Sequence, residues 1–484
     1  GSRLTIAPGT VVLFRKGGYI KVHGTITAKG TADDSIYFLH ERSDLEWQGI
    51  RLLKRNAGFT GYDSSFISFC TLKKTYCIDT DSSFMTKGAA VYCGPGNYLE
   101  LSNTLIADNE GYHGGAVYAD SSSIIQIENC FFKGNSVGYF GGGAIMTNDN
   151  GAKKLHVREC RFEYNTARTG GAIRIGKGTT AEFNNCVFYR DTTYSVNPVY
   201  GDLKGGALAI FGPADVTLRN CIIFFCRSYD KGGGIYSQDA SIKLINCTIA
   251  RNSAIYGGGI YFARDSAASS PLLVNTIEYV NGRIPSSKIP NDSSGWGFFL
   301  DSSVTPIFRY CHLRNTVYDH TINPYQGKFD NSQYYKTDFV CVSPFFKYSD
   351  TVVEGYQLSS TFAGDDPGIN GGTPDTTGLG LPEYDLLGQK RVYGDAIDVG
   401  AIEYNDTILP STTIARINKQ PRFNLKYNRA VIYTLNGRKV DFFLGKISMR
   451  SLRESAGGRL PKGMYIIALY LPGRQCKLER LLVK

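Results

Sequence analysis

The feature that most constrains the fold is a short motif of two glycines, a small residue and an aliphatic residue, which returns along the chain. Its copies begin at Gly114, Gly142, Gly170, Gly205, Gly232 and Gly257, with looser ones at Gly88 and Gly295. Most successive copies lie 25 to 28 residues apart, whereas propeller blades need about 40 to 50 residues. The leucine-rich-repeat frame is missing. The chain is therefore predicted to stack one small unit per repeat.

A second marker, a Cys or Thr that usually follows Asn, keeps step with the glycine motif. It occupies Cys70, Thr104, Cys130, Cys160, Cys186, Cys221, Cys247, Thr276 and Cys311. Five residues after most of these positions stands an Asn or Asp, at Asn109, Asn135, Asn165, Asp191, Asn252 and Asn281. Two independent markers with one period predict that equivalent residues of successive repeats lie above one another.

Between the markers, short segments alternate apolar and polar residues, as in 123–128 and 240–245. This is the pattern of strands with one buried face, and no capped helical pattern of ten residues or more is seen. A repeat of about 27 residues with two or three strands fits one coil of a parallel β-helix. The predicted class is all-β, and a right-handed solenoid follows the preference of parallel crossovers.

The stacking of coils also explains the role of the twelve cysteines. Neighbouring parallel strands lie roughly 4.8 Å apart, so an inward column has room only for small side chains. A structural ladder of buried free thiols is therefore expected, with a disulfide framework as the alternative. The closely spaced pairs Cys70 with Cys77 and Cys221 with Cys226 fit the ladder least well. Because the chain has no Cys-x-x-Cys pair and its six His are scattered, no metal site is predicted.

The repeats resemble those of a known family. The Gly-Gly-Ala-Ile motif alternates with Phe132–Asn135 (Phe-Lys-Gly-Asn) and Phe162–Asn165 (Phe-Glu-Tyr-Asn). Over 88–316 this pattern resembles chlamydial polymorphic outer-membrane proteins, which are adhesive β-helices. Because such short motifs recur across many surface proteins, the resemblance implies the fold more specifically than the function.

Both ends of the repeat region also resemble those of bacterial extracellular β-helix proteins. Residues 4–14 and 47–50 are similar to first coils, and 366–404 is similar to a closing segment. An open stack exposes unpaired strand edges that a cap must cover. The predicted domains are a β-helix over 1–406, of which 317–406 forms an irregular loop and C-terminal cap, and a second domain over 407–484.

The tail has strand-like runs at 431–435, 463–470 and 478–484, with turns between them, and is predicted to form a small antiparallel β-sandwich. It resembles the C-terminal sorting domain of the Bacteroidetes type IX secretion system, although the usual Pro-Asn-Pro start is absent. The residues that carry this resemblance are Gly437, Arg438, Gly463, Tyr465 and Lys484. The resemblance implies that the protein crosses the outer membrane and is secreted or attached to the cell surface, with secretion machinery as a partner. The alternative is a carbohydrate-binding or purely structural β-sandwich.

Charge argues against a nucleic-acid partner for the main body. The net charge is +10, but 407–484 holds 16 Lys and Arg against 3 Asp and Glu, which leaves 37 basic and 40 acidic residues in 1–406. No run approaches the roughly 18 apolar residues of a membrane-spanning helix, so no transmembrane segment is predicted.

Enzymatic and cofactor chemistry find little support in the sequence. Polysaccharide lyases and glycoside hydrolases with this fold need acidic and basic side chains that converge on one groove, and no coil places carboxylates at matching outward positions. Acidic residues cluster only in the cap, at Asp365, Asp366, Asp375, Asp395 and Asp398. Turn bonding is their expected role and calcium binding the alternative, so no cofactor is predicted.

Three insertions lengthen the repeat after its Asn position, at 192–204, 282–294 and 317–338, and they should emerge on one side of the solenoid. The third is aromatic and polar, which suits a sugar or protein surface. Its candidate ligand-binding residues are Tyr318, His320, Tyr325, Tyr334 and Tyr335. The alternative is that these rings only cover the end of the core.

The sequence therefore predicts a non-catalytic, secreted or surface-attached β-helix that binds a glycan, or a host or bacterial surface protein, in adhesion. A polysaccharide lyase or glycoside hydrolase is the first alternative. A purely structural surface component is the second.

Overall fold

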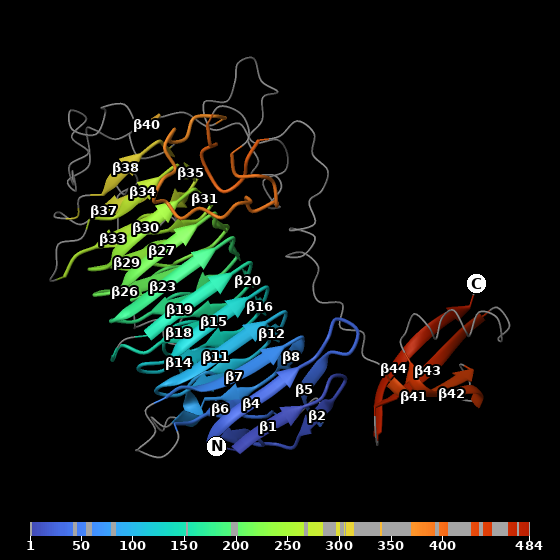
Figure 1. Ribbon diagram of the computed structural model, residues 1–484. Coiled ribbons are helices and arrows are strands. Elements are labelled where there is room, and N and C mark those ends of the chain that lie inside the picture. The colour runs from blue at the N-terminus through green and yellow to red at the C-terminus, as the bar shows by residue number, and fades with distance from the viewer. Residues whose placement is uncertain are drawn as a thin grey trace.

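The structure is a computed structural model with three long parallel sheets wound into one solenoid (Figure 1). It describes 2–313 apart from 42–45, 55–60, 79–83, 152, 195–201, 266–269, 284–296, 301–303 and 305. It also describes 339–340, 369–404 apart from 393–395, and the backbone of four strands within 427–483. Among these residues, none belongs to a helix that is long and apolar enough to cross a membrane.

Each coil gives one strand to each sheet, in the order first, third, second. The first sheet holds β1 (Ser2–Ile6), β4 (Gly24–Lys29), β7 (Asp63–Ser68), β11 (Asn97–Ser102), β15 (Ile124–Glu128), β19 (Lys153–Arg158), β23 (Thr179–Asn184), β27 (Asp215–Arg219), β30 (Ser241–Ile245), β34 (Leu272–Val274) and β38 (Ile307–Arg309). The second sheet holds β3 (Ile20–Val22), β6 (Ile50–Leu52), β10 (Val91–Cys93), β14 (Val117–Ala119), β18 (Ile145–Thr147), β22 (Ile173–Ile175), β26 (Leu208–Phe211), β29 (Ile235–Gln238), β33 (Ile260–Ala263) and β37 (Phe298–Leu300).

The third sheet and the turns complete each coil. The third sheet holds β2 (Val11–Phe14), β5 (Ile36–His40), β8 (Cys70–Lys73), β12 (Leu105–Ala107), β16 (Phe131–Lys133), β20 (Arg161–Glu163), β24 (Val187–Tyr189), β28 (Ile222–Phe224), β31 (Thr248–Ala250), β35 (Ile277–Tyr279), β39 (Cys311–Leu313) and β40 (Phe339–Val340). Two-residue strands pair in the turns: β9 (Tyr76–Cys77), β13 (Glu110–Gly111), β17 (Ser136–Val137), β21 (Thr166–Ala167) and β25 (Thr192–Thr193), and separately β32 (Ser253–Ala254) with β36 (Gly282–Arg283). One short 3-10 helix, η1, spans Phe84–Thr86.

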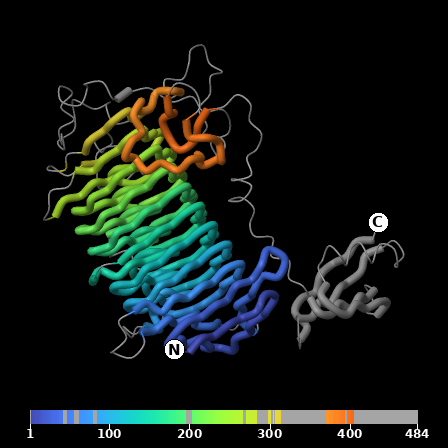
Figure 2. Tube along the Cα trace, viewed as in Figure 1, coloured from blue at the N-terminus to red at the C-terminus, as the bar shows by residue number. Residues whose placement is uncertain are grey.

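The predicted all-β parallel β-helix is confirmed, and the tube in Figure 2 shows the stacked coils from blue to yellow. The glycine pairs are explained by the turn before the second sheet. Gly170 adopts a φ of +64°, a left-handed conformation that favours glycine. Gly171 lies so close to the backbone of the next coil that a Cβ would collide with the carbonyl oxygen of Gly206. The motif therefore marks where successive turns touch.

The predicted Cys and Thr ladder lies at the start of the third-sheet strands or directly before them, inside the solenoid. Its nine members are at most 3% exposed. The thiol of Cys160 contacts the carbonyl oxygens of Arg158 (3.1 Å) and Ile127 (3.8 Å), the latter in the preceding coil. The ten cysteines among the described residues are all free and buried.

A second buried column runs through the asparagines. The side-chain amide of Asn109 donates to Oδ1 of Asn135 (2.8 Å), and Asn135 donates in the same way to Asn165 (2.9 Å). Asn165 donates to Oδ1 of Asp191 (2.9 Å), and Cys226 takes the corresponding place in the next coil. These hydrogen bonds satisfy the polar atoms that the turns bury.

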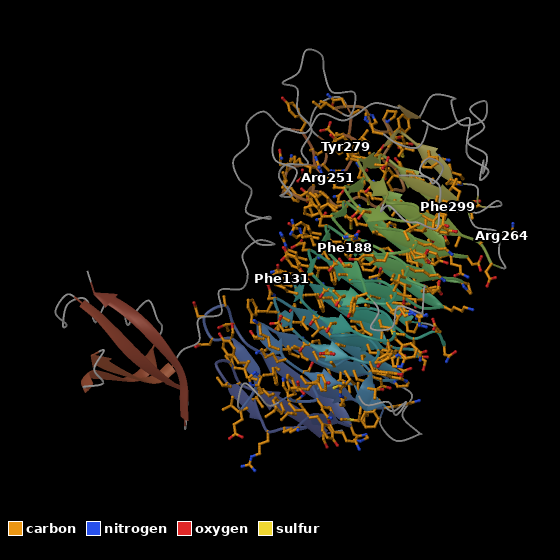
Figure 3. All side chains as sticks on the ribbon, turned by 180° about the vertical axis from the view of Figure 1, so that it is seen from behind. Phe131, Phe188, Arg251, Arg264, Tyr279 and Phe299 are labelled. Atoms are coloured by element: carbon orange, nitrogen blue, oxygen red, sulfur yellow. The ribbon has the colours of Figure 1, made fainter. Side chains whose placement is uncertain are left out.

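Residues 369–404 pack against the side of the solenoid rather than continuing the repeat. Leu386, Leu387, Ala401 and Ile402 cover the outward side chains of β24, β28 and β31, among them Ile222. Backbone bonds such as that from Gly400 N to Asn275 O (2.7 Å) hold the segment in place. Figure 3, from the back, labels Tyr279, which packs against the cluster that Ile277 and Val399 form at this contact.

The tail contains one antiparallel sheet with the order β42 (Lys439–Ile447), β41 (Tyr427–Thr434), β43 (Gly463–Leu471) and β44 (Arg474–Val483). Gly463 and Tyr465 lie in β43, while Gly437, Arg438 and Lys484 lie outside the described residues. The sandwich, the domain boundaries and the sorting role stay predictions.

Candidate functional site

Two parallel rows of side chains run along the outside of the second sheet. The strand row is the second residue of each strand from β10 to β37, which faces outward while its neighbours enter the core. It holds Tyr92, Tyr118, Met146, Arg174, Ala209, Tyr236, Tyr261 and Phe299. The turn row is the residue before each glycine motif and holds Lys87, His113, Gly141, Thr169, Lys204, Lys231 and Tyr256. The repeat therefore determines which side chains lie together.

Lysines of the turn row lie over tyrosines of the strand row. The ammonium group of Lys87 lies 5.3 Å from the ring centre of Tyr118, and that of Lys204 lies 5.0 Å from Tyr236. Such cation–π contacts are attractive. They help to explain why Tyr118 and Tyr236 are only 4% and 3% exposed on the outside of the solenoid.

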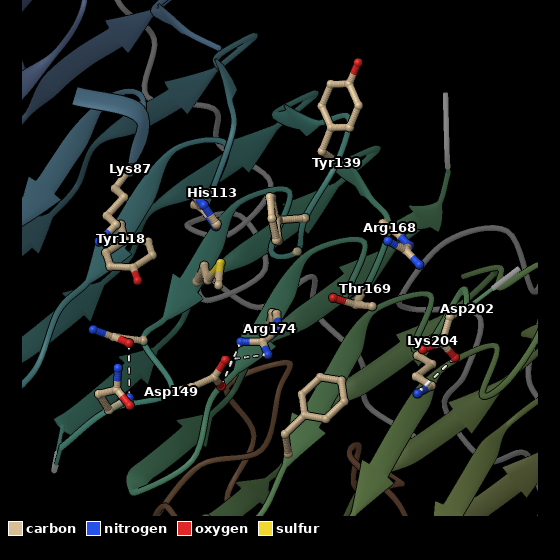
Figure 4. Close-up of a pocket in the computed structure, with 16 residues that line it drawn as sticks. Lys87, His113, Tyr118, Tyr139, Asp149, Arg168, Thr169, Arg174, Asp202 and Lys204 are labelled. Atoms are coloured by element: carbon tan, nitrogen blue, oxygen red, sulfur yellow. Dashed lines mark hydrogen bonds and ion pairs between the residues drawn. The ribbon is translucent and has the colours of Figure 1, made fainter. Parts of the chain in front are cut away.

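A groove of about 540 Å³ opens where the rows carry Gly141 and Met146 instead of Lys and Tyr (Figure 4). The side chain of Arg174 crosses the space above Gly141, since a Cβ there would collide with Cδ of Arg174. The groove is lined by Lys87, His113, Tyr118, Tyr139, Phe140, Gly141, Met146, Asn148, Asp149, Asn150, Arg168, Thr169, Arg174, Asp202, Lys204 and Phe211.

Cations outnumber carboxylates in this lining, four to two. Arg174 donates two hydrogen bonds to Asp149 (3.1 and 2.9 Å), and its guanidinium lies 4.7 Å from the ring centre of Phe211. Lys204 pairs with Asp202 at 3.0 Å. The side chains of Asp149 and Asp202 are 44% and 54% exposed, so each pair contributes little to stability.

His113 adds an aromatic face rather than a charge. Its ring stacks on Phe140 with 4.1 Å between the ring centres. Burial, followed by the charges of Lys87 and Arg174, lowers the pKa of His113 to about 4, so the imidazole is neutral at neutral pH. Beside it, Tyr139 and Phe140 are 53% and 42% exposed at the rim.

The groove offers ring faces, amides and cations together. Asn148 is held by a 2.5 Å hydrogen bond to Asp120, which also accepts the hydroxyl of Tyr92 (2.6 Å). In the part of the chain that the structure describes, no group of three or more His, Cys, Asp and Glu could hold a metal ion. The chemistry at hand is therefore recognition by stacking, hydrogen bonding and charge.

The predicted site residues Tyr318, His320, Tyr325, Tyr334 and Tyr335 lie outside the described residues. The insertion at 192–204, in contrast, supplies Asp202 and Lys204 to the groove. Sequence reasoning missed the other lining residues, although the residue before each glycine pair repeats Lys at positions 87, 204 and 231 and could have indicated the row.

Two of the cap aspartates are described, and both bond to turn backbone. Asp375 accepts from Thr377 N at 2.9 Å, and Asp398 accepts from Asn370 N at 2.7 Å. Asp365, Asp366 and Asp395 lie outside the described residues.

Two curated proteins are similar to part of this chain. "Probable autotransporter YfaL" of Escherichia coli (strain K12) is 29% identical over 205 residues, which are 38% of this chain and 16% of that protein. Metabotropic glutamate receptor-like protein R of Dictyostelium discoideum is 24% identical over 156 residues, 32% of this chain and 9% of that protein. The chain therefore spans less than a fifth of either relative.

Two solved structures are also similar. Pectate lyase Pel9A has 13% identity and a TM-score of 0.36, with 83% of this chain and 89% of that one covered. A mutant of the PL6 family alginate lyase AlyGC has 13% identity and a TM-score of 0.27, with 72% and 54% covered.

The family model named "Right handed beta helix region" matches residues 43–188 and 144–333, which together make up more than half of the chain. The matched residues are those that build the coils around the groove. The chain belongs to the right-handed β-helix family.

Proposed function

We propose that this protein is a secreted or cell-surface β-helix protein that binds glycans, without cleaving them, in the groove beside the second sheet. Similarity to a probable autotransporter supports the surface location. The groove volume of about 540 Å³ is within the range of small-ligand sites. Adhesion is the role that such binding would serve.

The observation that carries the proposal is the pairing of exposed rings with fixed polar groups. The rings of Tyr139 and Phe140 are about half exposed at the rim, although His113 covers one face of Phe140, and the apolar face of a sugar ring packs on exposed aromatic surface. Asn148, Thr169 and Arg174 lie within the same lining and can hydrogen-bond to sugar hydroxyls. A rigid solenoid holds these groups in place before the ligand arrives.

Catalysis has one favourable observation, which is that a carboxylate and a guanidinium, Asp149 and Arg174, share the groove. Both oxygens of Asp149 are held by Arg174, however, and this arrangement favours positioning over proton transfer. A lyase or glycoside hydrolase therefore remains the alternative function. A structural surface component, which would bind no ligand, is the third.

A glycan panel tests the proposal with the full chain. We expect retention of at least one glycan class, and an approximately tenfold weaker affinity in Phe140→Ala, because a stacked aromatic contact contributes about 0.5–1.5 kcal/mol beyond area burial. Tyr62→Ala is the matched control, since Tyr62 is 52% exposed before β7. New reducing ends or unsaturated uronates would identify an enzyme, and an empty panel would contradict glycan binding.

We further propose that residues 407–484 are read by type IX secretion machinery. The support is the motif resemblance at Gly437, Arg438, Gly463, Tyr465 and Lys484. A fluorescent protein fused to 407–484 is expected to leave a host that has this machinery, and its retention inside would contradict the proposal.

A further inference from the structure

The two rows continue beyond the groove, and this extension indicates what kind of ligand they fit. We propose that the ligand is a carboxylated or sulfated polysaccharide that lies along the solenoid axis on a strip from Lys87 to Lys231. The inference rests on the proposed glycan binding and adds the charge and the length of the chain.

The cations of the strip are placed by the coil repeat. Lys204 and Lys231 are bridge partners on successive coils, roughly 4.8 Å apart along the axis. Lys231 lies over Tyr261 at 5.4 Å, as Lys204 lies over Tyr236. Among the described residues, no carboxylate forms an ion pair with Lys87 or Lys231. Their charge is therefore available to an anion.

The groove cations can exchange their protein partners for a ligand. Asp149 and Asp202 are about half exposed, so their pairs with Arg174 and Lys204 are screened by water. Each cation side chain is better buried, at 15% and 14% exposed, and keeps its place when a partner leaves. A carboxylate or sulfate on the ligand can accept the same hydrogen bonds.

The spacing of the charges fits a linear chain. Lys87 and Arg174 belong to coils three steps apart, about 14 Å, and Lys87 and Lys231 to coils five steps apart, about 24 Å at the usual strand spacing. Between the ends lies the Phe140 ring, which is 42% exposed and suits an uncharged part of the sugar chain. A chain of several sugars with repeated acidic groups would contact both ends, and a single sugar would not.

A nucleic acid fits the strip less well. Single strands are bound by exposed rings on which successive bases stack. Here Tyr118, Tyr236 and Tyr261 are 3–6% exposed beneath their lysines, so their faces are already covered. The body over 1–406 also has slightly more acidic than basic residues, which repels a dense polyanion outside the strip.

Titration of the full chain with defined oligosaccharides tests the inference. The probes are a trisaccharide and a decasaccharide of galacturonate, sulfated oligosaccharides of the same lengths, neutral cello-oligosaccharides, and single-stranded DNA. We expect the anionic decasaccharide to bind at least tenfold more tightly than the neutral one, and less tightly as salt rises. The carboxylated and sulfated arms distinguish the source of the charge.

Two variants locate the strip. Lys231→Gln should weaken the anionic decasaccharide at least threefold and leave the trisaccharide unchanged, because Lys231 lies beyond the groove. Lys243→Gln, an exposed lysine on the first sheet, should change neither. Equal affinity for neutral and anionic chains, tighter DNA binding, or an unchanged decasaccharide affinity in Lys231→Gln would overturn the inference. Binding of neutral glycans alone would leave the proposed function standing, and loss of all glycan binding would remove both.

Discussion

A single residue, Asp191, takes the place of an asparagine in the buried column. It is fully buried, its Oδ1 accepts from Asn165 N (2.8 Å) and Nδ2 (2.9 Å), and its Oδ2 has no hydrogen-bond partner in the described structure. Burial raises the pKa of this carboxyl well above its usual value. Burying this unsatisfied carboxyl oxygen therefore costs free energy of folding that an asparagine would avoid.

We expect Asp191→Asn to stabilise the protein at neutral pH by about 1 kcal/mol, because a new amide can donate to the preceding coil and no buried charge remains. Since the folded state raises the pKa of Asp191, the parent is most stable below the unfolded pKa and loses stability as the pH rises. The gain should therefore shrink from pH 7 to pH 4. Thermal unfolding at both pH values measures it, and a less stable variant at pH 7 would contradict this role.

Among the structural elements, the side-packed segment 369–404 contains a cluster of buried ionisable side chains. Arg391 pairs with Glu403 (3.1 Å), whose backbone N donates to Asp385 (2.8 Å). Asp398 N donates to the other Glu403 oxygen at 3.0 Å. Burial raises the pKa of Glu403 to about 8 and that of Asp385 to about 6, while Arg391 opposes both shifts.

Both raised pKa values predict that the stability of the segment falls as the pH rises. The two carboxyls favour the packed segment below their unfolded pKa values, and this contribution is lost as the pH rises through about 6 and then about 8. Amide exchange of 385–392, corrected for intrinsic rates, is expected to increase from pH 5 to pH 9, and less so in Glu403→Gln. Exchange that stays constant across this range would rule out the coupling.

Particular residues show how much of the fold could be predicted from the sequence. The glycine pairs and the Cys and Asn columns repeat because neighbouring coils touch there, so the sequence indicated stacking and register. The side packing of Leu386 and Ile402 follows no repeat and depends on which apolar residues of the third sheet stay uncovered. The groove was missed because it opens where Gly141 and Met146 replace the Lys and Tyr found elsewhere in the rows. This replacement is visible only when the rows are aligned in space.

In the whole molecule, the stack of coils provides a long and rigid surface. Each coil adds one residue to each row, so the side chains along a row set the chemistry of the surface coil by coil. In the rows beside the second sheet, lysines lie over tyrosines at Lys87, Lys204 and Lys231, and the groove opens between them. Because each coil contacts its neighbours, a ligand that spans several coils would meet a surface that is already ordered.

Hydroxyl-radical footprinting of the full chain with saturating glycan measures where the ligand lies. Binding in the groove predicts that oxidation of Tyr139 and Phe140 falls severalfold, while oxidation of the similarly exposed Tyr19 and Tyr62 does not change. Unchanged oxidation of Tyr139 and Phe140 in a protein that has bound the glycan would contradict it.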